Sequence, residues 1–171
     1  MEKKYRMTDE TMKLGSITLH RIEAIRDFGD VKAGDKGGWI EHEGNLSQDD
    51  TCWVGGNAMV YQDALVCCDA QVYDDARVFG SALVQGLAQV YGSAGVYGYA
   101  LVQGHARIYG YARVCGDSDV ESFAQVYGSA LVYGHTYVYG HAQVYGNAHV
   151  YGGQVYGDIQ VCGLVRESAR A

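Results

Sequence analysis

The chain has 171 residues, no proline, and 13 lysine and arginine residues against 20 aspartate and glutamate residues. This acidic balance argues against binding to a nucleic-acid backbone, which favours a basic face. The five cysteines are an odd number, and the N-terminal segment lacks the apolar core of a signal peptide. We therefore expect reduced thiols and a cytoplasmic protein. No run of apolar residues is long enough to predict a membrane-spanning segment.

The composition of the chain changes near residue 51. All five lysines and 11 of the 20 acidic residues lie in the first fifty residues, which show no repeat. We therefore predict a capping module over residues 1–50, a repeat array over 51–163 and a C-terminal tail over 164–171. Within the module, the alternation from Ile17 to Ile22 predicts a strand, and Trp39 and Trp53 are expected to pack over the first coil.

The array repeats every six residues. Starting at Val54 and stepping by six, seventeen consecutive positions up to Val150 are valine or isoleucine. Four residues after each of the first sixteen lies a small side chain, which is alanine in fourteen cases. Glycine recurs two residues after the aliphatic position, as at Gly80 and Gly86. The repeat is therefore V-x-G-x-A-x, and such a fixed period is typical of a solenoid.

The spacing within the repeat predicts a three-sided prism. The small residue and the next aliphatic residue are two apart on a strand, so both point inward, while the residues flanking the aliphatic one point outward. The glycine positions form turns in which φ is positive. The segment Ala82–Gly86 reads ALVQG and recurs eighteen residues later at Ala100–Gly104, so three hexapeptides make one coil. We predict an all-β parallel β-helix of about six coils.

The repeat slips once near the C-terminus. Val150 is followed by Val155, five residues later, which predicts a corner shortened by one residue in the segment YGGQV. The tail is expected to close that end of the array, because an exposed last strand would otherwise pair with other chains.

The combination of an aliphatic residue with a small residue four positions later resembles the left-handed β-helix hexapeptide-repeat superfamily, and a left-handed helix is what this resemblance implies. The N-terminal third more closely resembles the YdcK-like proteins of enteric bacteria and their phages, through the segments KYRMTDE, DFGDVKAGDKGGWIE and NLSQDDTCWV. The resemblance is close over residues 4–65 and extends further only as a repeat type. It implies a cap before a long β-helix, a phage or prophage origin, and the label of transferase that members carry because of their fold.

Two enzyme classes share this fold. Trimeric acyltransferases that use acetyl-CoA usually carry a catalytic histidine on an inserted loop, whereas these hexapeptides run without insertion and hold only Arg77, Arg107 and Arg113 as basic residues before the tail. A carbonic anhydrase of this fold binds zinc through three histidines, for which His105, His135 and His141 would be the candidates. His105 and His141 are two coils apart, about 10 Å, too far to share a metal with bonds near 2.1 Å. Acyl transfer stays the alternative function.

Outward residues eighteen apart form rows on neighbouring coils. We predict that two aromatic rows form the surface for a partner or a second copy: Tyr73, Tyr91, Tyr109, Tyr127 and Tyr145 on one face, and Phe79, Tyr97, Tyr133 and Tyr151 on another, with Cys115 in the gap. A purely structural role of stacked rings is the alternative. The third face is expected to carry Cys67, Gln85, Gln103 and Glu121, with Gln71, Gln89, Gln125 and Gln143 on its other row.

These patterns predict a non-enzymatic scaffold that binds a protein through its tyrosine-lined faces, as a homo-oligomer or with a host protein. We expect no catalytic residue, no metal, no cofactor, no membrane contact and no direct nucleic-acid binding. A further hypothesis is that the rod imitates a nucleic acid and occupies a host-defence or nucleic-acid-acting protein, through the acidic residues of the early coils, Asp63, Asp69, Asp74 and Asp75. Ordinary surface charge on a soluble rod is the favoured explanation of these residues.

Overall fold

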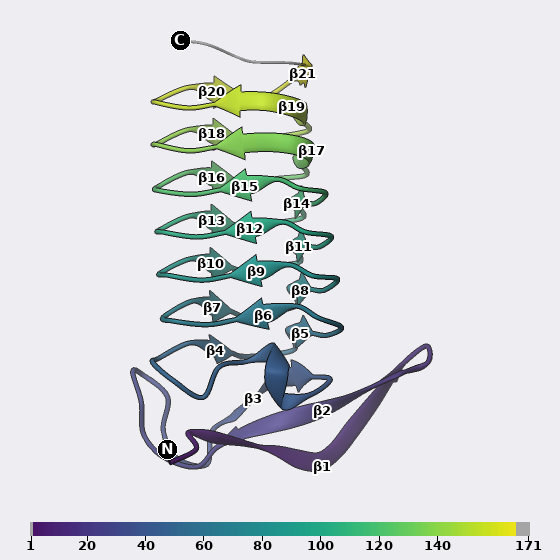
Figure 1. Cartoon of the computed structure of the whole chain (residues 1–171), viewed down its shortest axis with the longest axis vertical. Coiled ribbons are helices and arrows are strands. Elements are labelled where there is room, and N and C mark those ends of the chain that lie inside the picture. The colour runs from purple at the N-terminus through teal and green to yellow at the C-terminus, as the bar shows by residue number, and fades with distance from the viewer. Residues whose placement is uncertain (1, 167–171) are drawn as a thin grey trace.

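The computed structural model describes residues 2–166 and shows an all-β chain that winds into a three-sided parallel β-helix (Figure 1). This confirms the predicted fold. Most strands of the array are two residues long, with one outward residue followed by the inward aliphatic residue. They are β4 (Trp53–Val54), β5 (Met59–Val60), β6 (Leu65–Val66), β7 (Gln71–Val72), β8 (Arg77–Val78), β9 (Leu83–Val84), β10 (Gln89–Val90), β11 (Gly95–Val96), β12 (Leu101–Val102), β13 (Arg107–Ile108), β14 (Arg113–Val114), β15 (Asp119–Val120), β16 (Gln125–Val126), β17 (Leu131–Val138), β18 (Gln143–Val144), β19 (His149–Val155), β20 (Gln160–Val161) and β21 (Leu164–Arg166).

Strands stack in register on the strands one coil away, so that Gln89 pairs with Arg107 and Val90 with Ile108. Three faces result. Face 1 is the seven-stranded sheet of β4, β7, β10, β13, β16, β18 and β20. Face 2 contains β5, β8, β11 and β14, residues 131–132 and 149–150, and β21. Face 3 contains β6, β9, β12 and β15 with residues 137–138 and 154–155.

The interior of the prism is filled by the repeated alanine and aliphatic residues. Val90, Val96 and Val102 are fully buried in one coil, and Ala88, Ala94 and Ala100 are buried beside them. Small residues at every corner let three walls meet without a void, since protein interiors are close-packed. Backbone hydrogen bonds join each coil to the next, as from Tyr91 N–H to the Ile108 oxygen at 3.0 Å.

Corners need residues with positive φ. Gly80 has φ of 72°, and a Cβ there would lie 2.9 Å from the backbone nitrogen of Gly98 in the next coil. At two corners where another residue takes this position, Gln62 and Asp74, its side chain accepts a hydrogen bond from the glycine N–H of the next coil. Asp74 has φ of 58°, and its Oδ2 accepts a hydrogen bond from Gly92 N–H at 3.0 Å.

The stack has seven strands on face 1, one more coil than expected, because Trp53–Val54 and Gln160–Val161 both add a strand to that sheet. The shortened corner lies where the repeat slips: Val132 pairs with Val150, eighteen residues away, whereas Val138 pairs with Val155, seventeen residues away. Gly152 and Gly153 both have positive φ in this corner. Of the tail, β21 pairs with β19, and residues 167–171 lie outside the described residues.

The N-terminal segment forms an antiparallel meander that joins the helix (Figure 1). Strand β1 (Tyr5–Leu14) pairs with β2 (Ile17–Ala24), which contains the predicted strand, and β2 pairs with β3 (Lys36–Ile40). Strand β3 then pairs in parallel with β5, and Leu46, after the 3-10 helix η1 (Glu43–Asn45), bridges to Val66. The triangular stack therefore includes residues before 51, so it extends into the cap.

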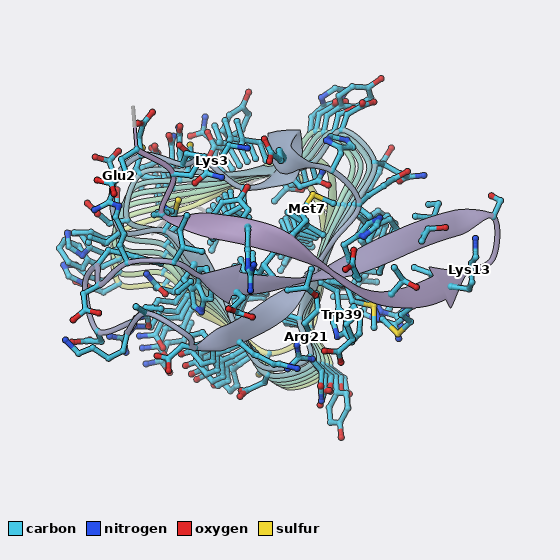
Figure 2. The ribbon with its side chains drawn as sticks, turned by 90° about the horizontal axis from the view of Figure 1, so that it is seen from below. Glu2, Lys3, Met7, Lys13, Arg21 and Trp39 are labelled. Atoms are coloured by element: carbon cyan, nitrogen blue, oxygen red, sulfur yellow. The ribbon has the colours of Figure 1, made fainter. Side chains whose placement is uncertain are left out.

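The cap is fastened by a buried lysine. The Lys4 side chain is fully buried, and its Nζ donates hydrogen bonds to the Asp49 oxygen at 2.8 Å and the Cys52 oxygen at 2.9 Å. Trp53 packs against the cap, with its ring centroid 5.4 Å from that of Phe28. Trp39 differs from expectation: its strand position directs it to the outside of face 2, where the Arg21 guanidinium lies 5.1 Å from its ring (Figure 2).

Within residues 2–166 the structure contains no helix that is long and apolar enough to cross a membrane.

Candidate functional site

The first predicted aromatic row forms an unbroken ladder on face 1. Ring centroids of consecutive tyrosines are 5.0, 5.0, 4.9 and 5.3 Å apart, with interplanar angles of 2° to 12°, along Tyr73, Tyr91, Tyr109, Tyr127 and Tyr145. The rings are half-buried because each covers the face of the next. Viewed along the helix axis, outward side chains of successive coils overlap in rows (Figure 2). The ladder therefore offers ring edges and hydroxyl groups to solvent.

A row of glutamines lies beside these tyrosines, and its predicted place on face 3 is wrong. Gln71, Gln89, Gln125 and Gln143 precede the inward residues of face 1, while the tyrosines follow the same inward residues. Both neighbours of an inward residue point outward from the same strand, so they share a face. The Tyr109 hydroxyl donates to Gln125 Oε1 at 3.2 Å, and the Tyr127 hydroxyl donates to Gln143 Oε1 at 3.0 Å.

Burial raises the pKa of Tyr73 and of Tyr109 above that of an exposed phenol, and the neighbouring phenols add to the effect. The hydroxyl groups of these two tyrosines therefore keep a proton to donate. Face 1 combines hydrogen-bond donors and acceptors with aromatic edges and carries one charged side chain in its outward rows from β7 to β20, that of Arg107.

The second predicted row is interrupted. Phe79 stacks on Tyr97 at 4.8 Å and, on its other side, on Tyr61 at 5.0 Å. Tyr61 extends the row and was absent from the predicted set, although the same eighteen-residue spacing could have identified it. Cys115 ends this stack, and beyond it the rings of Tyr133 and Tyr151 are tilted by 43°. Face 2 therefore has two short stacks in place of one continuous stripe.

The most exposed aromatic residues lie at corners, outside the two aromatic rows predicted from the sequence. Tyr99 is 73% exposed and Tyr111 is 71% exposed, each following a glycine of positive φ. Another corner, between faces 3 and 1, stacks His105 on Phe123 at 4.7 Å and Phe123 on His141 at 5.1 Å. The signal for these residues was the position after the turn residue of positive φ, which is glycine before each of them except Phe123, where it is Ser122.

Face 3 carries a row of polar side chains that are hydrogen-bonded from one coil to the next. Gln85 Nε2 donates to Gln103 Oε1 at 2.9 Å, and Gln103 Nε2 donates to Glu121 Oε2 at 3.0 Å. Beside Glu121, the Oδ1 atom of Asp119 is buried and has no hydrogen-bond partner among the described residues. Burial, with a smaller contribution from the Glu121 carboxylate, raises the pKa of Asp119 to about 6.

The three histidines considered as zinc ligands do not meet. Phe123 separates His105 from His141, and His135 lies at a different corner, where its Nδ1 is 3.4 Å from Asp117 Oδ2. Within the part of the chain that the structure describes, no three histidine, cysteine or acidic side chains converge as metal ligands. One hollow along the rod has a volume of about 280 Å³ and is lined by His105, Arg107, Phe123, Gln125 and His141.

The stacked coils and aligned rows define a parallel β-solenoid built from hexapeptide repeats. The model of the YdcK β-solenoid repeat matches this chain at residues 70–86 and 142–158. A relative from Escherichia coli (strain K12), named "Uncharacterized acetyltransferase YdcK", is 38% identical over 60 residues, which are 30% of this chain and 18% of that protein. Over these segments the chain is therefore similar to the β-solenoid repeat of YdcK proteins. The match spans less than a fifth of the relative's length.

Proposed function

We propose that this protein is a non-enzymatic cytoplasmic scaffold that binds through face 1, and that its first partner is a second copy of the chain. The observation that carries the proposal is the unbroken ladder of five tyrosines beside a row of glutamines. Tyrosine is enriched at protein interfaces because it combines a large apolar area with a polar tip.

Charge supports face 1 as the contact surface. The chain has a net charge of −7, yet face 1 has one charged side chain in its outward rows from β7 to β20, the cation of Arg107. Interface cores are depleted of charged residues, because ions lose hydration when they are buried. Faces 2 and 3 carry Arg77, Arg113, Asp119 and Glu121 in the corresponding rows.

The repeat favours a second copy over an unrelated partner. Neighbouring strands are about 4.8 Å apart in any such coil, so two rods present rows with the same spacing. Tyrosine and glutamine side chains of one rod can then interdigitate with those of the other at every coil. A partner without this spacing would match one or two coils only.

The test is analytical ultracentrifugation of the purified protein. The wild-type chain is expected to sediment as an oligomer, and Tyr91→Ala with Tyr109→Ala is expected to shift it toward the monomer. The matched control is Tyr99→Ala with Tyr111→Ala, which removes two tyrosines from corners and should leave association unchanged. A wild-type chain that stays monomeric at high micromolar concentration would overturn the proposal.

Two additional variants separate association from folding. Gln125→Glu keeps an acceptor for the Tyr109 hydroxyl but places like charges on both copies, so association should weaken while the melting temperature changes little. Arg107→Gln completes the amide row and removes a cation that both copies carry, so association should strengthen. If Arg107→Gln weakened self-association, the Arg107 cation would contribute to the contact and the argument from like charges would be wrong.

We infer acyl transfer from acetyl-CoA as the second candidate function. The name of the E. coli relative favours it, as does the hollow in which His105 and His141 border the Arg107 cation. An acyltransferase should bind acetyl-CoA and release CoA, and His105→Asn or His141→Asn should lower that release. A chain whose melting temperature is unchanged by millimolar acetyl-CoA would exclude this candidate.

A further inference from the structure

A glycine interrupts the outward row of face 2. Gly95 pairs with Arg77 in the coil before it and with Arg113 in the coil after it, so two long side chains flank an empty position. A hollow of about 520 Å³ results, lined by Asp75, Arg77, Phe79, Ser93, Ala94, Gly95, Tyr97 and Arg113. We call it the Gly95 notch.

The backbone does not require glycine at this position. Gly95 is absent from the residues with positive φ, unlike the corner glycines. A Cβ there would make only ordinary contacts, at 3.7 Å from Tyr97 Cε1 and 3.9 Å from Arg113 Cγ. Every other outward position that opens a strand from β4 to β20 carries a side chain. Glycine within a strand is destabilising relative to alanine because it loses more backbone freedom on folding, so the notch is maintained at a cost to stability.

The two arginines lack carboxylate partners. Among residues 2–166, neither guanidinium lies within 4.0 Å of an acidic oxygen, whereas Lys3, Arg6, Lys32 and Lys36 of the cap all do. Asp75, the acidic residue of the lining, accepts a hydrogen bond at Oδ1 from Asn57 Nδ2 at 3.2 Å. Both arginines are exposed, so their donors are available to a ligand.

Spacing and charge indicate what the notch can hold. Arg77 and Arg113 are two strands apart, about 10 Å between their backbones, so their guanidinium groups can reach toward each other over Gly95. Two cations match the charge of a phosphate dianion better than that of a single carboxylate, and a guanidinium donates to phosphate through two parallel hydrogen bonds. The Ser93 hydroxyl and the aromatic wall of Phe79 and Tyr97 border the same space.

We propose that the Gly95 notch binds the phosphate group of a small molecule between Arg77 and Arg113. The site lies on face 2 and is independent of the association proposed for face 1. The aromatic wall provides an apolar surface for the organic part of such a ligand. Arg77 and Arg113 are two of the three basic residues in the array before β21.

The test is a titration of the full chain with inorganic phosphate, followed by NMR of the backbone amides and the arginine Nε–H groups. Saturable shifts are expected at Gly95, Arg77 and Arg113, and absent with acetate at matched ionic strength. Arg77→Gln or Arg113→Gln should each weaken binding about tenfold, and the matched control Arg107→Gln should not.

A second variant, Gly95→Leu, blocks the notch and keeps both arginine charges, so it separates binding in the notch from general attraction to positive charge. Leucine occupies the same outward position at Leu83, Leu101 and Leu131, so the variant should fold with an unchanged or higher melting temperature. It should nevertheless abolish the phosphate shifts, because its side chain fills the notch. Shifts that do not saturate, or that persist in Gly95→Leu, would overturn the proposal and indicate general attraction of anions to arginine.

Discussion

The cap and the array are held together in different ways. In the cap, single contacts that occur once fix the structure, such as the Lys4 ammonium group on the backbone oxygens of the first coil and the ion pair of Lys36 with Glu10. In the array, one set of hydrogen bonds and one valine–alanine interior recur in every coil. One substitution can therefore remove the main anchor of the cap, whereas in the array it removes one copy of a repeated contact.

The largest effect is expected from Lys4→Met. This change removes the ammonium donor shared by the backbone oxygens of Asp49, Asp50 and Cys52, so the free energy of unfolding should fall by about 3 kcal/mol. Urea denaturation followed by circular dichroism measures it. Lys13→Met is the control, because Lys13 is exposed and its Nζ donates a hydrogen bond to Thr18 Oγ1 at the surface. Equal midpoints for the two variants would show that the cap does not depend on the buried ammonium group.

A second effect tests the corners of the array. Gly80→Ala places a Cβ 2.9 Å from Gly98 N at a φ of 72°, so the free energy of unfolding should fall by about 2 kcal/mol. Gly146 has φ of 63° but nothing within 4 Å of its Cβ position. Gly146→Ala should therefore cost only about 1 kcal/mol, from backbone strain alone. Equal losses in the two variants would mean that contact between coils does not matter at the corners.

A third effect comes from the row on face 3 and depends on pH. Because the pKa of Asp119 is raised to about 6, the folded state binds its proton more tightly than the unfolded state does. The stability of the wild type should therefore rise as pH falls from about 6 to about 4, by about 1 kcal/mol after allowance for solvent screening. Asp119→Asn should remove this dependence and stabilise the protein at neutral pH. Parallel stability curves for the two proteins over this range would contradict the argument.

The smallest expected effect is a gain in stability. Gly95→Ala should raise the free energy of unfolding by about 0.5 kcal/mol, because alanine loses less backbone freedom on folding and meets no clash. Differential scanning calorimetry can detect the change. A loss of stability would show that the notch serves folding rather than a ligand.

The array was predictable because its signal is local and repeated. Each inward valine and each turn glycine recurs at the same position of the next coil, so the register and the tyrosine ladder can be predicted from the eighteen-residue spacing. The one-residue shortening between Val150 and Val155 was predictable for the same reason. The glutamine row was misplaced because two rows that flank one inward residue share a face, and this relation had to be applied strand by strand.

The cap could not be predicted in the same detail. Lys4 meets residues more than forty positions away, and its burial depends on how the meander folds back on the first coil. Trp39 continues the outward row of face 2, because β3 pairs with β5. The first fifty residues have no repeat from which that pairing could be predicted. The exposed corner residues Tyr99 and Tyr111 were missed because only strand positions were compared.

The fixed register has a consequence for how such a gene can change its length. Because residues eighteen apart occupy equivalent positions, an in-frame duplication of eighteen codons would insert a whole coil and leave every row in phase. A duplication of six codons would instead rotate all later rows by one face and cut the tyrosine ladder in two. Recombination within the array should therefore preserve the faces only when it copies complete coils.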